Sequence, residues 1–296
     1  MLIVLNPAAG RGRARKLTQD IRNAFSGVAM TDVRETREAG EEETLARQAI
    51  ERGVTTIVAI GGDGTCTRVA NAILKSEREC LLAVLPCGTG NDFAKTLGVI
   101  DYNPEDLAAL VANGSVTRID VGRIDDNYFI NSCGFGFDAS VLEATKRVRF
   151  LKGDAVYIYS ALSQLFTYRG MEVSAHGVPS LKRGPMLMVT VSNGRFLGGA
   201  FKIAPHASVL DGRLDACFFS DCNVVQRMKL FVGAMRGTHI GMPSVSIASV
   251  QRLALTFPSS PLMEIDGELR VARSRTVELQ CVPRALSVVA APGALV

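Results

Sequence analysis

The chain has 296 residues, 47% of them hydrophobic, which is enough to bury a large core and to form two domains. Its 33 basic and 29 acidic residues leave a formal net charge of +4, too balanced for a nucleic-acid-binding protein but compatible with weak attraction to an anionic membrane surface. No apolar run reaches the roughly 18 residues of a transmembrane helix, and the apolar start is too short for a signal peptide. We therefore expect a cytoplasmic protein.

Cysteine and histidine spacing argues against disulfide bonds and zinc. The cysteines are odd in number, lie in apolar segments and include no C-x-x-C pair, so we expect reduced, buried thiols. The histidines are far apart and no H-E-x-x-H motif occurs, which gives a zinc site little support. The residues concerned are Cys66, Cys80, Cys87, Cys133, Cys217, Cys222, Cys281, His176, His206 and His239.

Strand and helix patterns alternate over residues 1–121. Strands that are apolar on both faces, separated by helices, are typical of a parallel sheet covered on both sides, with its ligand beyond the carboxyl ends of the strands. In the helix expected at 40–53, Leu45, Ala46, Ala49 and Ile50 form the apolar face, and the Glu and Arg residues fill the other face. Strands are expected at 2–6, 29–36, 55–61 and 81–88, and the other helices at about 15–25 and 67–76.

Residues 122–296 are mostly strand-like segments joined by turns, with helical patterns only at about 138–168 and 223–237. This pattern predicts a second domain that is a mostly antiparallel β-sandwich. The extreme C-terminus is compatible with a return to the first domain. Exposed edges of the β-rich domain are compatible with a homodimer.

The stretch GGDGT, residues 61–65, follows an apolar strand. Gly61 and Gly62 let the backbone turn without a Cβ atom, so that N–H groups and the next helix N-terminus can bind a phosphate. The carboxylate of Asp63 would repel a phosphate unless Mg²⁺ lies between them or Asp63 holds the loop by accepting backbone N–H groups. A tight structural turn is the alternative, and a P-loop is excluded because the chain has no Gly-Lys dipeptide.

The stretch PCGTGNDFA, residues 86–94, has the same design at the end of the next strand. Thr89 and Asn91 can form hydrogen bonds to a ligand, and Asp92 adds a second carboxylate. The two turns are expected to converge on one ligand. A helix N-cap at Asn91 or Asp92 is compatible with this function.

Two further turns carry carboxylates. Asp266 and Glu268 flank Gly267, where a hairpin could present both to a ligand or simply form a type I′ turn. Asp211 lies in PHASVLDGRLD, where a carboxylate and backbone carbonyl groups could hold Mg²⁺ or Ca²⁺, or form a plain Asp-Gly turn.

Two other segments suggest different functions. Gly134, Gly136 and Ala139 fit a G-x-G-x-x-A dinucleotide pattern, but the strands that follow do not alternate with helices, so tight packing of a helix on a sheet explains them as well. Residues 146–152, KRVRFLK, interleave basic and apolar side chains and suit a peripheral contact with anionic lipid, although an ordinary solvated helix end is the simpler interpretation.

The motifs NPAAGRG, GGDGT, PCGTGNDFAKTLG, NSCGFGFDASV, SNGRFLGGAFKIAPHASVLDGRLD and EIDGE resemble, in this order, those of the diacylglycerol kinase catalytic-domain family and its compact bacterial lipid kinases. The resemblance extends from Asn6 to Glu268. It implies an N-terminal α/β domain like those of phosphofructokinases and NAD kinases, a C-terminal β-sandwich-like domain, and ATP bound in the cleft between them. The implied nucleotide-binding residues are Asn6, Thr36, Gly61, Gly62, Asp63, Gly64, Thr65, Cys66, Thr67 and Thr89, to which the second turn adds Asn91 and Asp92.

The resemblance also implies roles for the two carboxylate turns. Glu268 would accept the proton of the lipid hydroxyl group, with Asp266 as its close alternative. Ser208 and Arg213, through their carbonyl oxygens, and Asp211, through its side chain, would hold a structural Mg²⁺, and Asp63 would belong to the network of Mg²⁺ and water that holds ATP.

The chain departs from the family pattern after the first glycine turn. Where the family commonly has Asn-Glu-Val, this sequence has Thr67, Arg68 and Val69. Arg68 could add positive charge near the triphosphate, face solvent from the first turn of a helix, or indicate a changed substrate or an inactive relative.

Taken together, these features predict an ATP- and Mg²⁺-dependent kinase that phosphorylates a lipid hydroxyl group at the inner face of the membrane. The alternatives are a kinase with a soluble acceptor, similar to NAD kinase, and a catalytically silent regulator that binds nucleotide or lipid. The sequence does not identify the lipid.

Overall fold

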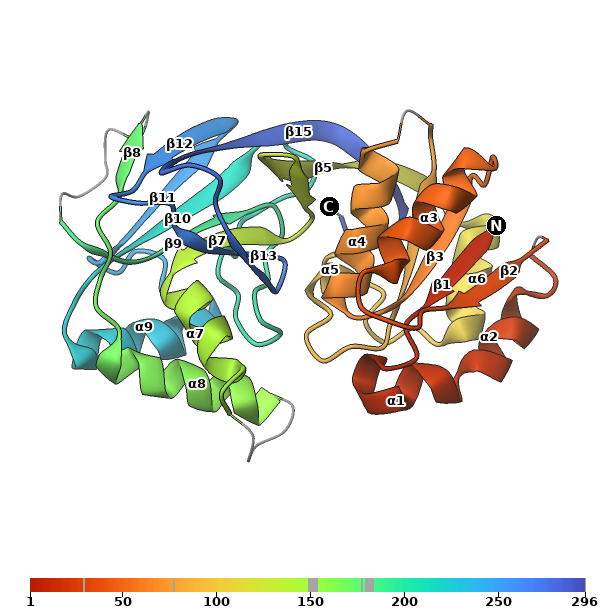
Figure 1. Ribbon diagram of the computed structural model, residues 1–296, viewed down its shortest axis with the longest axis horizontal. Coiled ribbons are helices and arrows are strands. Elements are labelled where there is room, and N and C mark those ends of the chain that lie inside the picture. Colours follow the sequence, from red (N-terminus) through yellow and green to blue (C-terminus); the bar gives the residue numbers. More distant parts are fainter. Residues whose placement is uncertain (29, 77, 149–153, 177, 179–183, 296) are drawn as a thin grey trace. The chain divides into compact units, whose positions relative to one another are not determined.

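The computed structural model describes residues 1–28, 30–76, 78–148, 154–176, 178 and 184–295, and these form two compact units (Figure 1). Unit 1 comprises Met1–Val121, Val209–Asp211 and Pro283–Val296. Unit 2 comprises Gly122–Ser208 and Gly212–Val282. The chain passes from one unit to the other within strands β5 (Val116–Ile124) and β15 (Thr276–Val289), and it also enters and leaves unit 1 around Val209–Asp211. No helix in the described part of the chain is both long and apolar enough to cross a membrane.

Unit 1 is built on a parallel sheet. Its strand order is β2 (Asp32–Glu35), β1 (Leu2–Leu5), β3 (Thr56–Gly61) and β4 (Leu81–Pro86), and the end of β15 pairs beside β4. Residues 57–60 of β3 have no exposed surface, because both faces of the sheet are covered.

Helices cover both faces of this sheet (Figure 1). One face packs against α1 (Ala9–Lys16), α2 (Thr18–Phe25) and α6 (Pro104–Asn113) through a shared apolar core. The other face packs against α3 (Glu41–Glu51) and α4 (Asp63–Leu74), while the short helix α5 (Asp92–Thr96) follows β4. Helix α4 begins four residues earlier than expected, and α6 was not predicted.

Unit 2 contains a six-stranded antiparallel sheet and a second group of strands. The six strands are, in order, β11 (Val245–Val250), β10 (Leu214–Ser220), β9 (Met186–Ser192), β7 (Ser132–Gly136), β13 (Leu262–Ile265) and β14 (Glu268–Val271). The second group is β5 with β6 (Asn127–Phe129), and β15 with β12 (Arg252–Thr256) and β8 (Ser174–His176). Phe135, Phe218, Leu255 and Leu279 belong to the core that the two groups share.

The described helices of unit 2 lie in two places along the chain. Helices α7 (Phe137–Thr145) and α8 (Asp154–Thr167) follow β7, and α9 (Val224–Arg236) lies between β10 and β11. Leu230 and Ala234 of α9 pack with Cys217 and Phe219 of β10 in a second apolar core. The helical segment expected over 138–168 contains two helices, α7 and α8. The prediction of an α/β domain followed by a mostly antiparallel β domain is confirmed.

Candidate active site

The two glycine-rich turns of unit 1 touch through their backbones. A Cβ atom on Gly88 would lie 2.4 Å from the Cα of Gly62, and the N–H of Cys87 donates to the carbonyl of Gly61 at 2.8 Å. Because only a residue without a Cβ allows this approach, glycine is required at position 88, and a Cβ atom on Gly62 would itself make a tight contact of 3.2 Å with the Cα of Gly88. The structure brings the two turns together as expected, and their sharing of one ligand stays a prediction.

Most of the GGDGT segment is the first turn of α4 rather than a loop. Gly62 precedes the helix, and the N–H of Cys66 already donates to the carbonyl of Gly62 at 3.2 Å. The side chains of Thr65, Cys66 and Thr67 are buried, whereas Gly62, Asp63 and Gly64 are half-buried. The part of this segment that a phosphate can approach is therefore its beginning, where a helix offers N–H groups outside its own hydrogen-bond ladder.

The carboxylate of Asp63 joins the two turns. Its Oδ1 accepts the N–H of Phe93 at 3.1 Å, in the first turn of α5. Asp63 thus holds the neighbouring loop by accepting a backbone N–H group, one of the two roles that the sequence left open, and its part in Mg²⁺ binding stays a prediction.

Asn91 and Asp92 are committed to local contacts. Asn91 has a φ of +52°, and its side chain both accepts from the N–H and donates to the carbonyl of Gly88, each at 2.9 Å. Asp92 forms an ion pair with Lys95 at 3.0 Å. Asn91 does occupy the N-cap position of α5, one of the two positions considered, but its side chain makes no capping bond to the helix. Thr89 is exposed and is the residue of this turn most open to a ligand.

A buried carboxylate organises the end of β1. Glu42 of α3 has no exposed surface, and its Oε1 accepts from Asn6 Nδ2 at 3.2 Å and from Thr65 Oγ1 at 3.3 Å. Its Oε2 accepts the N–H of Gly40 at 2.9 Å. The prediction that every glutamate of α3 lies on the charged outer face was therefore wrong for Glu42, which lies beside two predicted nucleotide contacts, Asn6 and Thr65.

Arg68 is the partner of this carboxylate. Its Nη1 lies 3.3 Å from Glu42 Oε2, and its side chain is only 23% exposed. Arg68 therefore does not simply face solvent, and its charge compensates a buried carboxylate. The nearby Thr36, also a predicted nucleotide contact, is 7% exposed and follows β2, where its N–H donates to the carbonyl of Leu5 at 2.9 Å.

In unit 2, Asp266 is buried and fully engaged in holding another segment. Asp266 and Gly267 both have positive φ, at +46° and +87°, as a type I′ hairpin turn between β13 and β14 requires. The carboxylate of Asp266 accepts the N–H groups of Ile130, Asn131 and Ser132 at 2.8 to 2.9 Å.

Glu268 follows this turn at the beginning of β14 and differs from Asp266 in exposure. Its side chain is 28% exposed and lies 3.3 Å from the guanidinium of Arg270. Asp266 itself is only 4% exposed. Of the two carboxylates left open by the sequence, Glu268 is the one that a substrate can approach.

The turn predicted to hold a metal offers hard oxygen donors. Asp211 is exposed and Ser208 half-exposed, and Gly212 between Asp211 and Arg213 has a φ of +72°. The guanidinium of Arg213 is directed to Ser249 of β11, with Nε 2.9 Å from its hydroxyl oxygen, so the Arg213 carbonyl is compatible with a cation. One carboxylate and backbone carbonyls fit Mg²⁺ or Ca²⁺. Within the described residues, no three His, Cys, Asp or Glu side chains cluster as a metal site.

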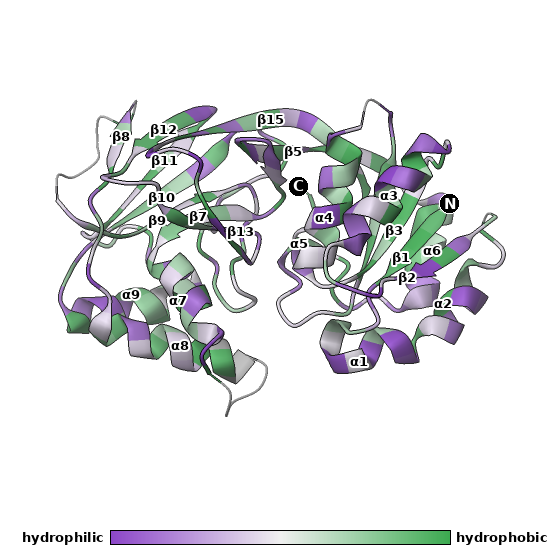
Figure 2. Ribbon diagram, in the orientation of Figure 1, coloured by the Kyte–Doolittle hydropathy of each residue, from purple (hydrophilic) through white to green (hydrophobic). Residues whose placement is uncertain are grey.

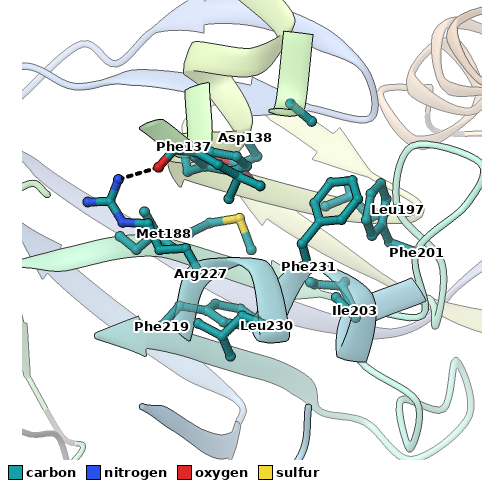
Figure 3. A pocket seen from close by; sticks show the side chains of 14 residues that line it. Phe137, Asp138, Met188, Leu197, Phe201, Ile203, Phe219, Arg227, Leu230 and Phe231 are labelled. Carbon is teal, nitrogen blue, oxygen red and sulfur yellow. Dashed lines mark hydrogen bonds between the residues drawn. The ribbon is translucent and has the colours of Figure 1, made fainter. Parts of the chain in front are cut away.

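An apolar pocket in unit 2 was not predicted from the sequence (Figure 3). Its walls come from α7, α8, α9, β9, β10 and the segment 197–203. Arg227 of α9 donates to the carbonyls of Leu165 and Tyr168 at 2.9 Å, which ties α9 to the end of α8. The lining residues are Phe137, Asp138, Ala161, Leu165, Leu187, Met188, Leu197, Phe201, Ile203, Phe219, Arg227, Leu230, Phe231 and Ala234.

Among the residues that the structure describes, Asp138 is the only carboxylate that lines this pocket. It is 3% exposed and accepts from the N–H of Ala139 at 2.7 Å and from Thr190 Oγ1 at 3.4 Å. Burial raises its pKa from 3.8 to about 7. A Cβ atom on Gly134 would lie 1.6 Å from Asp138 Oδ2, so the glycine of the apparent dinucleotide motif makes room for this carboxyl group.

The basic stretch 146–152 lies largely outside the described residues, which end at Val148 and resume at Asp154. Of its described residues, Arg147 is exposed and lies 3.9 Å from Glu143. The predicted lipid contact of this stretch stays a prediction.

Comparisons with known proteins agree on one family. Residues 1–124 match the diacylglycerol kinase catalytic domain, and residues 131–290 match the YegS C-terminal NAD kinase beta sandwich-like domain. The chain is 28% identical to a diacylglycerol kinase of Bacillus subtilis, with 90% of this chain and 88% of that protein covered. It is 33% identical to a "probable lipid kinase YegS-like" of Pseudomonas putida, with 83% and 85% covered. A crystal structure of a diacylglycerol kinase from Bacillus anthracis matches with a TM-score of 0.76 at 20% identity, covering 100% and 97% of the two chains.

Removal of Arg68 should destabilise unit 1, because Glu42 would keep its charge without a compensating cation. We expect Arg68→Met to lower the free energy of unfolding by about 2 kcal/mol, less than the cost for a fully buried pair because Arg68 is partly exposed. Arg47→Met is the matched control, since the pair Arg47–Glu51 is exposed and 3.7 Å apart, and should cost at most about 0.5 kcal/mol. Urea unfolding measures both. Equal losses would contradict the role given to Arg68.

The pKa of Asp138 predicts a pH dependence of stability. Between about pH 4 and pH 7 the folded protein keeps a proton that the unfolded chain has released, so Asp138 lowers stability as the pH rises. Asp138→Asn should therefore gain stability relative to the parent protein by up to about 3 kcal/mol over this range. Asp101→Asn, at an exposed position, should follow the parent. A constant difference between Asp138→Asn and the parent at all pH values would show that Asp138 titrates normally.

Proposed function

Because the chain belongs to the diacylglycerol kinase catalytic-domain family of bacterial lipid kinases, we propose that it transfers the γ-phosphoryl group of ATP to a hydroxyl group of a lipid. The observation that carries this proposal beyond family membership is the apolar pocket of unit 2, a cavity of about 60 Å³ whose lining suits a short hydrocarbon segment of a lipid. A nucleotide or sugar acceptor would need many more polar groups than this lining offers.

The nucleotide is proposed to bind unit 1 at the carboxyl ends of β1, β3 and β4. The support is the pair of touching turns at Gly62 and Gly88, where the backbone can approach a phosphate closely. Exposed Thr89 can donate to a phosphate oxygen. Asn6 and Thr65 are oriented by their shared contact with Glu42.

Magnesium is proposed in two roles. When bound with ATP, Mg²⁺ would neutralise charge on the phosphate oxygens as the γ-phosphoryl group leaves ADP. Asp63 and Asp92 are the carboxylates of the two turns and, besides their contacts with Phe93 and Lys95, would contribute to the network of water and oxygen ligands around this ion. A second, structural ion would be held by Asp211 and the carbonyls of Ser208 and Arg213, where Ca²⁺ also fits.

Glu268 is proposed as the proton acceptor. As the lipid hydroxyl oxygen forms its bond to the γ-phosphorus, the carboxylate of Glu268 takes the hydroxyl proton and ADP departs with the electrons of the broken P–O bond. Asp266 is less suited to this role, because its carboxylate accepts three backbone N–H groups. Its role is to position the hairpin that carries Glu268.

The acceptor class can be tested with ATP labelled at the γ-phosphate. The protein is incubated with Mg²⁺ and, in parallel, with a total lipid extract, NAD and sugar phosphates. We expect label in the organic phase with the lipid extract only, and mass spectrometry of that phase would identify the lipid. Label on NAD or on a sugar phosphate would show a soluble-acceptor kinase, and ATP consumption without any labelled product would favour a silent regulator.

The assignment of Glu268 predicts different effects for its substitution and that of Asp266. Glu268→Gln should fold normally and lose about 10²- to 10⁴-fold in kcat on the labelled lipid. Asp266→Asn should instead lose about 2 kcal/mol of unfolding free energy, because an amide NH₂ would face the N–H of Ile130.

The control for both substitutions is Asp126→Asn, which removes a carboxylate that is 69% exposed and should change neither quantity. Steady-state kinetics on the labelled lipid and urea unfolding distinguish the two roles. Wild-type turnover in Glu268→Gln, together with a stable but inactive Asp266→Asn, would transfer the proton-accepting role to Asp266.

A further inference from the structure

Exposed apolar side chains concentrate on two helices of unit 2. In the described part of the chain, thirteen large hydrophobic residues are exposed, and seven of them lie on α8 and α9. These helices make up a small fraction of the chain, so the concentration is not the scatter of single apolar residues normal on protein surfaces. Figure 2 shows hydrophobic positions along both helices.

On α9 the exposed apolar residues form one side of the helix. Val225 and Val232 are seven residues apart, which is two turns, and Val224 and Met235 lie beside them. Val225 is 65% exposed and Val232 44%. The opposite side carries Arg227, Leu230 and Ala234, which are buried.

Helix α8 has the same division. Ile158, Tyr159 and Phe166 are exposed, with Phe166 at 64%. Tyr159 and Phe166 are seven residues apart and so lie on the same side of the helix. Ile158, the least exposed of the three at 36%, lies between this side and the buried Ala161 and Leu165. The docking face is defined here as these three residues together with Val224, Val225, Val232 and Met235.

The buried sides of the same helices form walls of the apolar pocket. Ala161 and Leu165 of α8 and Leu230, Phe231 and Ala234 of α9 line it. Arg227 holds the helices together through the carbonyls of Leu165 and Tyr168. The two helices that carry the docking face therefore also supply walls of the pocket, through their buried residues.

The charges around the docking face suit an anionic surface. No Asp or Glu occurs from residue 222 to 253, a stretch that contains Lys229 and Arg236, both exposed on α9. Residues 155–168 contain no charged side chain. A helix with an apolar side bordered by basic residues is typical of segments that lie in the interface of an anionic bilayer.

We propose that the docking face seats unit 2 on an anionic bilayer, with the apolar residues of α8 and α9 among the acyl chains and with Lys229 and Arg236 at the phosphate groups. The proposal rests on the lipid kinase function, for which it identifies the surface that meets the substrate's membrane. The helices that meet the bilayer would then be the same helices that wall the pocket.

The absence of tryptophan from the sequence allows a direct test. In Phe166→Trp the new indole is the only one in the protein, and it should shift its emission to the blue on equimolar phosphatidylglycerol and phosphatidylcholine vesicles and be quenched by brominated lipid. Val116→Trp, at a position of unit 1 that is 57% exposed, is the matched control and should show neither change. If the Phe166→Trp protein binds vesicles but its indole emission neither shifts to the blue nor is quenched by brominated lipid, the proposal is overturned.

Binding measurements without ATP separate this proposal from the proposed function. Val225→Asp with Val232→Asp should lower the vesicle partition coefficient by at least about tenfold, and Lys229→Gln with Arg236→Gln by about tenfold on anionic vesicles only. Val116→Asp should bind as the parent protein does. If both functions hold, the docking variants keep their activity on a short-chain diacylglycerol dissolved in detergent.

Two results would have different meanings. If the parent protein phosphorylates no lipid but the substitutions in the docking face abolish its vesicle binding, the docking proposal stands and the kinase proposal fails. Docking variants that bind vesicles normally but convert a dimer into monomers, measured by sedimentation, would show that the face meets a second copy of the chain and would overturn the membrane proposal.

Discussion

A carboxylate removed from water must be compensated by hydrogen bonds or by an opposite charge, and this requirement fixes candidate functional residues in each unit taken by itself. Glu42 meets it with the side chains of Asn6, Thr65 and Arg68. Asp266 meets it with three backbone N–H groups. Each buried carboxylate thereby fixes the position of a neighbouring element that carries a proposed functional residue. Substitution of these groups is expected to act through geometry rather than through the chemical step.

Asp138 meets the same requirement in a different way. Its few hydrogen bonds do not offset its burial, which raises its pKa to about 7. A protonated carboxyl group can donate a hydrogen bond to an ester carbonyl, whereas the charged form accepts from a hydroxyl group. The pocket therefore has one polar position whose hydrogen-bonding character changes with pH, set in a lining that is otherwise suited to hydrocarbon.

The sequence predicted those features that depend on local pattern. Apolar strands such as 55–61, followed by glycine-rich turns, predicted the parallel sheet and the edge at which the turns meet. The run of strand-like segments joined by turns predicted the second domain. It did not predict contacts between residues distant in the chain. Glu42 was placed with the other glutamates of its helix because helical periodicity cannot show that Arg68 and Asn6 come to it from other elements. The pocket around Asp138 was missed for the same reason, since its walls come from six separate parts of the chain.

The glycines illustrate how a motif and a packing requirement can look alike in sequence. Gly88 is needed because the Cα of Gly62 lies where its side chain would be, and Gly134 is needed because the carboxyl group of Asp138 lies there. The first case brings two backbone turns into contact, and the second seats a carboxyl group under a helix. Only the residue that fills the space of the missing Cβ atom distinguishes the two. A glycine pattern therefore identifies a close approach, and the chemistry of the approaching group decides whether a ligand or the protein itself required it.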